Sequence, residues 1–392
     1  MSLALALAMC FGLAAPTYAY DSHKISTYTT VSAHGADTAV VDENGTLWMC
    51  GLNDYGQLGN GSRTGSNVPI RVMDNVASVS SGGTHTAAIK TDGTLWTWGS
   101  NIDGELGNGE DTYDTSSNIP VKVMEDVAAV SCGTNFTAAL KTDGSLWMWG
   151  DNSYGQIGNG KQYTGHYENN PQPVKVMEDV AAVSCGSCHV AALKTDNSLW
   201  IWGSNRRGEL GNGGVGNGTT YAGDVIVQTV PVKLMDNVTA VSCGEQFTAI
   251  IKEDGSLWTW GANFSGELGN GWTGNGTYLE DPIQTVPVKV MDNVAFVSCG
   301  HSHAAAIQAD GSLWIWGSNE TGALGNGGGG NESDNGVPIQ TVPLKVMDGA
   351  AAVSCGADFT MAVKTDHTIW LWGSNLLGQL GNGGVGNDTY YS

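Results

Sequence analysis

A Cys-x-x-Cys-His run is the motif with the most specific chemistry in this sequence, and it spans Cys185 to His189. This spacing is that of a c-type haem attachment site. However, its first cysteine and its histidine recur at equivalent positions elsewhere in the chain, as Cys132, Cys243, Cys299 and Cys355 and as His85 and His303. Only Cys188 lies outside this repeated pattern. The sequence therefore favours an overlap of repeated residues over a haem site, and we expect no cofactor.

Histidine alternates with phenylalanine at one repeated position, which also holds one aspartate. A zinc site needs several nitrogen, oxygen or thiolate donors within about 2.0–2.3 Å of one ion. Histidines in every second repeat do not obviously converge, and phenylalanine supplies no ligand atom. We therefore predict packing rather than metal binding at this position, which is occupied by Asp37, His85, Phe136, His189, Phe247, His303 and Phe359.

Cysteine is common at a second repeated position, where a small and soft side chain packs well in a core. Of the 8 cysteines, one lies in the N-terminal apolar run, which leaves an odd number without paired spacing. A disulfide would also need a short Cα separation. We predict reduced core thiols, with Cys185 and Cys188 as the only plausible local bridge.

Carboxylates are plentiful, and a suitably spaced pair could hydrolyse a glycan. That alternative stays open, because the separation of carboxylates cannot be seen in the sequence. A sialidase-type propeller would need an arginine cluster, whereas this chain has only Arg63, Arg71, Arg206 and Arg207. Three glutamates replace a glutamine at a repeated loop position, where we predict a structural role: Glu105, Glu209 and Glu267. No catalytic residue type is common to all copies, so we predict a protein without enzymatic activity.

The element that must position all these residues is a repeat built on LWTWGSNIDGELGNG, Leu95 to Gly109. Its first tryptophan recurs as Trp48, Trp96, Trp147, Trp200, Trp258, Trp314 and Trp370, with spacings by subtraction of 48, 51, 53, 58, 56 and 56. Repeats of about 50 residues indicate an array in which each unit buries its face against its neighbours. We predict a core position for the 13 tryptophans of this motif, out of 14 in the chain.

The sequence pattern of each unit predicts short strands and shows no helical periodicity. The second copy has an extended VASVSSGG, then HTAAIK, a Thr-Asp-Gly turn and LWTWG, and a strand of PVKVM type closes the unit. Asp-Gly between two apolar runs is a strong hairpin signal, and proline suits an edge strand. Seven such units predict an all-β, seven-bladed propeller.

The stretch VSCGTNFTAALKTDGSLWMWGDNSYGQIGNG, Val130 to Gly160, resembles the repeat of the regulator of chromosome condensation family, including alpha-tubulin suppressor-like secreted propellers. The resemblance implies a seven-bladed propeller of such repeats and, from the founding family member, nucleotide exchange on a small GTPase as an alternative function. The repeat signatures lie near residues 31–61, 79–109, 130–160, 183–213, 241–271, 297–327 and 353–383.

The N-terminal residues predict export. An apolar run from Leu3 to Ala15 is too short to span a bilayer and is followed by a small-residue cleavage pattern. We expect a signal peptide over residues 1–19, a single propeller domain over residues 20–392, and a secreted or cell-surface location. We also expect the strand Lys24 to Thr30 to complete the last blade, because the seventh unit lacks a PVKVM strand.

The formal net charge of −22, from 16 Lys and Arg against 38 Asp and Glu, argues against nucleic-acid binding. Basic proteins or cations are more natural partners, although acidity also keeps an exported protein soluble. We find no stretch that predicts a transmembrane helix, and we expect a monomer.

The linkers between the GNG turn and the proline strand vary in length, and the three longest are consecutive. Insertions of this kind collect on one face of a repeat array and often form its binding surface. Aromatic residues beside carboxylates suit a protein or glycan partner, although they also fit solvated loops. The predicted binding residues are Tyr221, Asp224, Trp272, Tyr278, Glu280, Asp281, Glu332 and Asp334.

Overall fold

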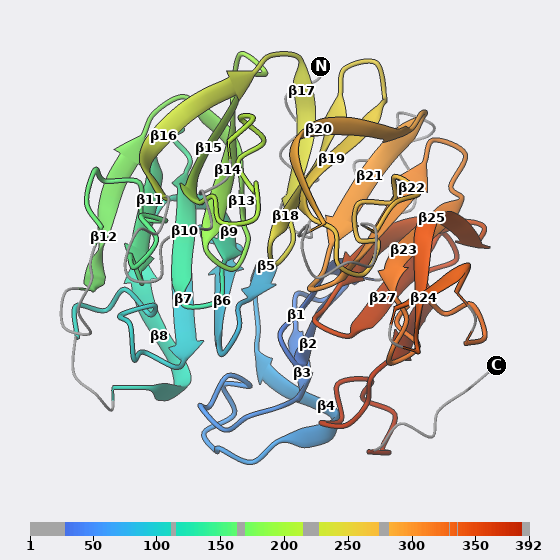
Figure 1. Ribbon diagram of the computed structural model, residues 1–392. Helices are drawn as coiled ribbons and strands as arrows, with labels where there is room; N and C mark the ends of the chain where they lie inside the picture. Colours follow the sequence, from blue (N-terminus) through green and yellow to red (C-terminus); the bar gives the residue numbers. More distant parts are fainter. Residues whose placement is uncertain are drawn as a thin grey trace, which may run out of the picture.

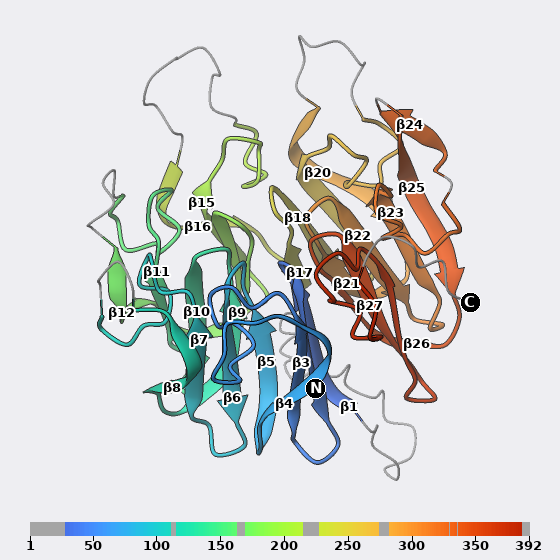
Figure 2. The same cartoon turned by 90° about the horizontal axis from the view of Figure 1, so that it is seen from below.

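The computed structural model describes residues 28–110, 115–162, 169–214, 227–273, 282–328, 330–334 and 336–385. These residues form antiparallel sheets, seven in number, arranged as blades around a central axis. Figure 1 looks down this axis, with fourth strands such as β12 and β16 at the periphery. Figure 2 shows the ring edge-on, with strands of neighbouring blades side by side. The predicted seven-bladed, all-β propeller is therefore confirmed.

Each blade follows the strand order of the repeat, from the axis outward. The innermost strands are β1 (Tyr28–His34), β5 (Val76–Ser81), β9 (Val127–Cys132), β13 (Val180–Cys185), β17 (Val238–Cys243), β21 (Val294–Cys299) and β26 (Ala350–Cys355). The second strands are β2 (Asp37–Asp42), β6 (His85–Lys90), β10 (Phe136–Lys141), β14 (His189–Lys194), β18 (Phe247–Lys252), β22 (His303–Gln308) and β27 (Phe359–Lys364).

The tryptophan motif forms the third strand of every blade, and the proline strand forms the fourth. The third strands are β3 (Leu47–Gly51), β7 (Leu95–Gly99), β11 (Leu146–Gly150), β15 (Leu199–Ser204), β19 (Leu257–Ala262), β23 (Leu313–Ser318) and β28 (Ile369–Gly373). The fourth strands are β4 (Ser66–Met73), β8 (Ser117–Met124), β12 (Asn170–Met177), β16 (Val227–Met235), β20 (Ile283–Met291) and β25 (Val337–Met347), and β24 (Glu332–Asp334) adds a fifth strand to blade 6.

The two tryptophans of each motif differ in burial. Trp98 is fully buried, and its Nε1 donates to the Gln57 carbonyl of the preceding blade at 2.7 Å. Burying an indole of this size contributes roughly 4–6 kcal/mol before entropy is subtracted. Trp96 is only half-buried, because it lies toward the rim, where its Nε1 donates to Thr94 Oγ1 at 3.0 Å. The predicted core position is thus correct for the second tryptophan of blades 2 to 6, while Trp372 in blade 7 is only partly buried. The first tryptophan packs at the edge of the core in blades 1 to 6, and in blade 7 Trp370 is 45% exposed, so the prediction is wrong there.

A ring of serines on the innermost strands joins the blades at the axis. Each serine Oγ accepts a backbone N–H from the next blade at 2.9–3.1 Å. The Ala33 amide donates to Ser354 Oγ at 3.0 Å and closes the ring between blades 7 and 1. The channel inside this ring is narrow, with a volume of about 90 Å³. The serines are Ser32, Ser80, Ser131, Ser184, Ser242, Ser298 and Ser354.

The predicted closure by an N-terminal strand is wrong for Tyr28 to Thr30. These residues belong to β1, which pairs with β2 in blade 1, and blade 7 has three strands in the described chain. The reason is that Ser32 occupies the serine-ring position, so the residues ahead of it extend the same innermost strand. Blades 7 and 1 meet instead through contacts such as Thr38 Oγ1 donating to the Gln379 carbonyl at 2.7 Å. Lys24 and the predicted signal peptide lie outside the described residues.

Candidate binding face at the mouth of the channel

The propeller has two faces, and the backbone places different loops on each. On one face, which we call the hairpin face, the Asp-Gly hairpins touch the turns that lead to the next blade, as in Val127 N donating to the Gly93 carbonyl at 2.9 Å. On the other, the mouth face, the Gly-x-x-His or Gly-x-x-Phe loops meet the Asn-x-x-Gly loops. An example is Ser100 N donating to the Thr84 carbonyl at 3.0 Å. The linkers of variable length start and end on the mouth face, because they join a third strand to a fourth.

An inner ring of loops surrounds the channel at the mouth face. Each loop joins a first strand to a second, and neighbouring loops are hydrogen-bonded, as in Glu245 N donating to the Gly300 carbonyl at 3.3 Å. The loops enclose a hollow of about 200 Å³. One equivalent position of every blade lines it, together with Gly300 and Gly356; the residues at that position are Gly35, Gly83, Thr134, Ser187, Glu245, His301 and Ala357. The repeat therefore builds a site whose chemistry depends on one variable position per blade.

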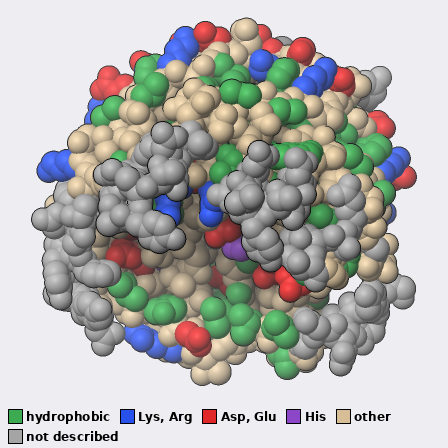
Figure 3. All heavy atoms as spheres, viewed as in Figure 1, with side chains coloured by type: hydrophobic (Ala, Val, Ile, Leu, Met, Phe, Trp, Pro, Cys, Tyr) green, Lys and Arg blue, Asp and Glu red, His purple; other side chains and the backbone are tan. Residues whose placement is uncertain are grey.

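A histidine and a carboxylate supply the charge in this hollow. His301 Nε2 lies 2.7 Å from Glu245 Oε2, and both side chains are partly exposed. The hydrogen bond to Glu245 raises the pKa of His301, although partial burial opposes the rise; the charges of Glu245, Asp358 and Glu267 contribute further. Figure 3 shows a histidine beside acidic side chains in a hollow near the middle of this face. The pair gives the mouth a titratable, polar centre.

An outer ring is formed by the tips of the Asn-x-x-Gly loops. Each loop is held by its asparagine, as in Leu106 N donating to Asn101 Oδ1 at 3.0 Å. Gly104 has φ +78°, and a Cβ there would lie 2.7 Å from Pro171 Cα of the next blade, so only glycine fits. The two residues between asparagine and glycine form the tips, which are Asp54-Tyr55, Ile102-Asp103, Ser153-Tyr154, Arg206-Arg207, Phe264-Ser265, Glu320-Thr321 and Leu376-Leu377.

Contacts between side chains join the two rings. Asn135 Nδ2 of the inner ring donates to Asp103 Oδ2 of a tip at 3.0 Å. Thr321 Oγ1 donates to the Asp358 carbonyl at 2.7 Å. Within the outer ring, the Arg207 guanidinium lies 5.0 Å from the centre of the Phe264 ring. The two rings therefore form one continuous surface on the mouth face.

The repeated glutamates lie beneath this surface and act as the predicted structural groups. Glu267 Oε2 accepts the Ser265 amide at 2.6 Å, as Gln57 Oε1 accepts the Tyr55 amide at 3.1 Å in blade 1. The Glu105 carbonyl also accepts Trp149 Nε1 of the next blade at 2.9 Å. Burial raises the pKa of Glu105 and of Glu267 to about 7. These carboxyl groups brace the tips from below.

The repeated histidines are buried, as predicted for a packing role. His189 Nε2 lies 3.0 Å from Thr248 Oγ1 of the next blade, and His303 Nε2 lies 2.9 Å from Thr360 Oγ1. Burial lowers the pKa of both imidazoles to about 4. Within the described ranges, no group of three or more His, Cys, Asp or Glu side chains could hold a metal ion.

The repeated cysteines also pack in the core. Burial raises the pKa of Cys132 and Cys355 to about 12, which suits inert thiols. All seven cysteines of the described chain are thiols rather than disulfides, Cys185 and Cys188 included. No helix in the described ranges has the length and apolar character that crossing a bilayer requires.

Most of the binding residues predicted from the linkers cannot be placed. Tyr221, Asp224, Tyr278, Glu280 and Asp281 lie outside the described residues. Trp272 is 37% exposed, and its amide donates to Asn270 Oδ1 at 3.1 Å. Glu332 and Asp334 lie in β24, which pairs with β25, but their side chains are not described.

Sequence reasoning missed the loop tips and the inner-ring pair. The signal for the tips was present, since the pair of residues after the asparagine differs in every copy, whereas the asparagine and glycine are the same in all seven and Gln or Glu follows the glycine in all but blade 6, which has Ala323. The pairing of Glu245 with His301 had no such signal, because it joins loops of two neighbouring blades.

Comparisons with known proteins agree with this architecture. The model of the RCC1-like domain matches residues 163–391, and two models of the regulator of chromosome condensation (RCC1) repeat match residues 44–89 and 92–140, and residues 76–105 and 127–156. The Ultraviolet-B receptor UVR8 of Arabidopsis thaliana is 29% identical over 280 residues, covering 69% of this chain and 58% of the receptor. The human probable E3 ubiquitin-protein ligase HERC3 is 36% identical over 310 residues, covering 76% of this chain and 28% of the ligase.

Among solved structures, Prp20p of Saccharomyces cerevisiae superposes with a TM-score of 0.71 at 22% identity, covering 86% of this chain and 82% of Prp20p. Of the two curated relatives, the Ultraviolet-B receptor and HERC3, this chain spans less than two thirds of the length.

Proposed function

Since the chain belongs to the regulator of chromosome condensation (RCC1) repeat family, we propose that it is an exported, non-enzymatic scaffold that binds a protein partner through its mouth face. Yeast Prp20p, which shares the fold, is known for binding Gsp1p and histones, and yeast RCC1 has been solved bound to Kap60. These examples support a protein ahead of a glycan as partner. Light reception and ubiquitin ligation belong to longer relatives, so neither is part of the proposal.

The observation that carries the proposal is the variety of the loop tips on a uniform backbone. Binding surfaces of repeat proteins place variable residues on a repeated frame. Here the tips carry acidic, basic, aromatic and aliphatic side chains in turn, while the asparagine and glycine that shape each loop stay the same. A surface that differs in every blade can recognise one partner in one orientation.

We place the centre of the interface on the tips of blades 6, 7 and 1. Leu376 and Leu377 are 58% and 43% exposed, and Tyr55 lies on the next tip. Acidic residues, Glu320 and Asp54, are exposed on either side of the leucines. Exposed apolar residues with a charged rim are typical of protein interfaces. The partner surface should therefore offer an apolar pocket flanked by Lys or Arg, in keeping with the net charge of −22.

We propose no catalytic step, because the buried groups of this face whose pKa values are shifted have structural roles. Glu105 and Glu267 accept backbone amides within their own loops, and His303 contacts Thr360 in the next blade. Each of these groups already holds a structural hydrogen bond. Export is proposed from the apolar N-terminal run alone.

The test is a quantitative pull-down with immobilised protein, followed by affinity measurement with each partner recovered. We expect the double variant Leu376→Ser, Leu377→Ser to weaken binding by at least tenfold, as for interface anchors of this size. Asp236→Ser and Asp292→Ser, two exposed changes on the hairpin face, serve as matched controls and should leave the affinity unchanged. A Trp272→Ala variant reports whether the interface reaches blade 5.

Equal affinity of the leucine variant and the wild type would overturn the proposed interface. Turnover of a glycan by the purified chain, or accelerated release of GDP from a small GTPase, would replace the binding scaffold with one of the two alternative functions.

A further inference from the structure

The charged pair in the hollow keeps one carboxylate oxygen for a ligand. His301 Nε2 lies 2.7 Å from Glu245 Oε2, and the two side chains are 49% and 32% exposed. Among the described residues, Glu245 has no other side-chain hydrogen bond, so its Oε1 can accept one from outside. His301 Nδ1 lies 3.0 Å from Ser302 Oγ. Both ring nitrogens therefore have partners, which can hold the imidazole in its charged and in its neutral form.

The backbone around the hollow offers hydrogen-bond acceptors rather than donors. Amides of the inner loops donate to carbonyls of the next blade at 3.2–3.4 Å, and these amides belong to Gly83, Ser187, Glu245, His301 and Ala357. The accepting carbonyls belong to residues that also line the hollow, such as Gly300 and Gly356. Each carbonyl oxygen keeps a second lone pair, whereas the amides are used. The hollow therefore suits a cation that donates hydrogen bonds better than an anion.

The size of the hollow suits a single side chain. Its volume of about 200 Å³ is below the roughly 300–1,000 Å³ of sites for small molecules. Gly35, Gly83 and Ala357 place no long side chain in it, and it is open on the mouth face, as Figure 3 shows. A side chain that projects from a partner on this face can enter it end first.

Acidic groups face His301 from more than one loop. The hydrogen bond to Glu245 is the main cause of the raised pKa of His301; burial opposes the rise, and the charges of Glu245, Asp358 and Glu267 add to it. His303 in the same blade stays neutral, because burial lowers its pKa to about 4. The hollow therefore holds an excess of negative charge whenever His301 is neutral.

The cations of this face lie toward blade 4. The Arg207 guanidinium lies 5.0 Å from the centre of the Phe264 ring, and its charge opposes the rise in the pKa of Glu209 that burial causes. Burial raises the pKa of Cys188 to about 12, and the charge of Arg206 opposes that rise. The charges that shift the pKa of His301 are instead all negative. A ligand in the hollow therefore meets an acidic environment.

We propose that the hollow binds the guanidinium group of an arginine side chain of the protein partner, with Glu245 and inner-ring carbonyl groups as its acceptors, and that protonation of His301 releases it. Arginine fits better than lysine, because its planar guanidinium has five N–H donors and can bridge a carboxylate and neighbouring carbonyl oxygens. The proposal rests on the protein-binding function proposed for the mouth face, and it specifies one residue of the partner.

The protonation state of His301 sets the charge that the arginine meets. In the neutral form, Nε2–H donates to Glu245, and the carboxylate charge remains for the guanidinium. In the protonated form, the imidazolium balances the carboxylate and repels a second cation. Because the pKa of His301 is raised, binding should be strongest above its folded-state pKa and should weaken as the pH falls through that value.

The test uses the intact chain and two peptides, acetyl-Gly-Arg-Gly-amide and the same peptide with citrulline, a neutral isostere of arginine. Binding is followed by NMR from the His301 ring signals, at pH values well above and well below the pKa of that ring. Above the pKa, we expect the arginine peptide to bind with a dissociation constant on the order of millimolar. The citrulline peptide should bind about fivefold more weakly, as expected for loss of a partly exposed ion pair. Saturation with the arginine peptide should in turn lower the His301 pKa, because linkage is reciprocal.

Two variants separate the roles of the pair. Glu245→Gln removes the acceptor charge and should weaken binding of the arginine peptide about fivefold above the His301 pKa. Glu125→Gln on the hairpin face is the matched control and should leave the affinity unchanged. His301→Gln should retain binding but lose its pH dependence, which a merely structural role of His301 would not produce. For the variants, binding is followed from the peptide signals, because one variant lacks the His301 ring.

Three results would overturn the proposal. Equal affinity of the arginine and citrulline peptides would show that the hollow does not recognise a cation. Tighter binding below the His301 pKa would make the hollow a site for anions. An affinity that Glu245→Gln leaves unchanged would place the peptide elsewhere. None of these results decides the wider mouth-face interface, whose test changes Leu376 and Leu377 and leaves the pair intact.

Discussion

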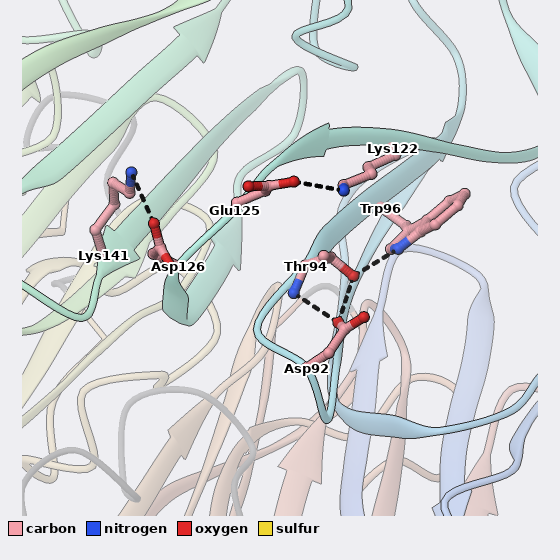
Figure 4. Close-up of polar contacts among 7 residues, drawn as sticks. All are labelled: Asp92, Thr94, Trp96, Lys122, Glu125, Asp126 and Lys141. Atoms are coloured by element: carbon pink, nitrogen blue, oxygen red, sulfur yellow. Dashed lines mark hydrogen bonds and ion pairs between the residues drawn. The ribbon is translucent and has the colours of Figure 1, made fainter.

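The hairpin face repeats one set of contacts from blade to blade. In blade 2, Asp92 Oδ1 accepts the Thr94 amide and hydroxyl at 3.0 and 2.6 Å, and Thr94 Oγ1 accepts Trp96 Nε1 at 3.0 Å (Figure 4). The neighbouring fourth strand contributes Lys122, which pairs with Glu125 at 2.7 Å. The same ion pair recurs as Arg71–Asp74, Lys175–Glu178, Lys233–Asp236, Lys289–Asp292 and Lys345–Asp348.

The mouth face uses an equally regular backbone but varies its exposed side chains. Glu245 and His301 occupy positions that hold glycine in blades 1 and 2, and the loop tips range from Arg206 to Leu376. The difference between the faces indicates which positions are constrained by turn geometry and which are available for recognition. Where a side chain closes its own turn, as Asp92 does, the residue type repeats. Where the turn is closed by asparagine and glycine, the intervening residues can differ.

The largest effect should come from a glycine that has a positive φ and also lies in close contact with the next blade. Gly104 on the mouth face and Gly93 on the hairpin face both have positive φ, but a Cβ on Gly104 would lie 2.7 Å from Pro171 Cα, whereas one on Gly93 meets its first heavy atom at 3.9 Å. We expect Gly104→Ala to lower the free energy of unfolding by about 3 kcal/mol or more, and Gly93→Ala by about 1 kcal/mol. Denaturant unfolding measures both; equal losses would show that the loops of the mouth face are not braced by the next blade.

A buried glutamate should make the mouth face sensitive to pH. Because the pKa of Glu267 is raised from 4.5 to about 7, its contribution is fully favourable below pH 4.5 and is lost as the pH rises through 7. Glu267→Gln should therefore raise the free energy of unfolding by roughly 2–3 kcal/mol at pH 8 and have little effect at pH 4.5. Thermal unfolding at both pH values tests this, with exposed Glu125→Gln as the hairpin-face control. A stability difference that does not change with pH would show that folding does not raise the pKa of Glu267.

The smallest effect should come from the pair in the hollow. Removing the charge in Glu245→Gln should lower the pKa of His301 toward 6.5, because the hydrogen bond to the carboxylate is the main cause of its rise. A raised histidine pKa adds stability below pH 6.5 that is lost as the pH rises through the folded-state value. The side chains are partly exposed, so this contribution should not exceed about 1 kcal/mol. NMR titration of the His301 ring measures its pKa in both proteins. An unchanged pKa would show that Glu245 and His301 are not paired in solution.

The regular part of the fold could be predicted in detail. The Asp92-Gly93 pair correctly marked a hairpin, and the alternation in the Trp96 strand correctly placed Trp98 in the core, because a short strand and a tight turn are fixed by neighbouring residues. Prediction failed at the ring closure, where Tyr28 joined blade 1, and at Trp370, which is exposed because β28 has no outer neighbour in the described chain. Both depend on which strands meet in space.

The sequence by itself determined the number of blades, the strand order within each blade and the buried position of the repeated histidines and cysteines. These follow from local patterns that recur in every copy. The tertiary structure decided that Glu245 meets His301, that the loop tips share one face, and that the residues ahead of Ser32 join blade 1. The physical reason is that these features join loops and strands of different blades. Their proximity comes from closing the ring, which no single repeat encodes.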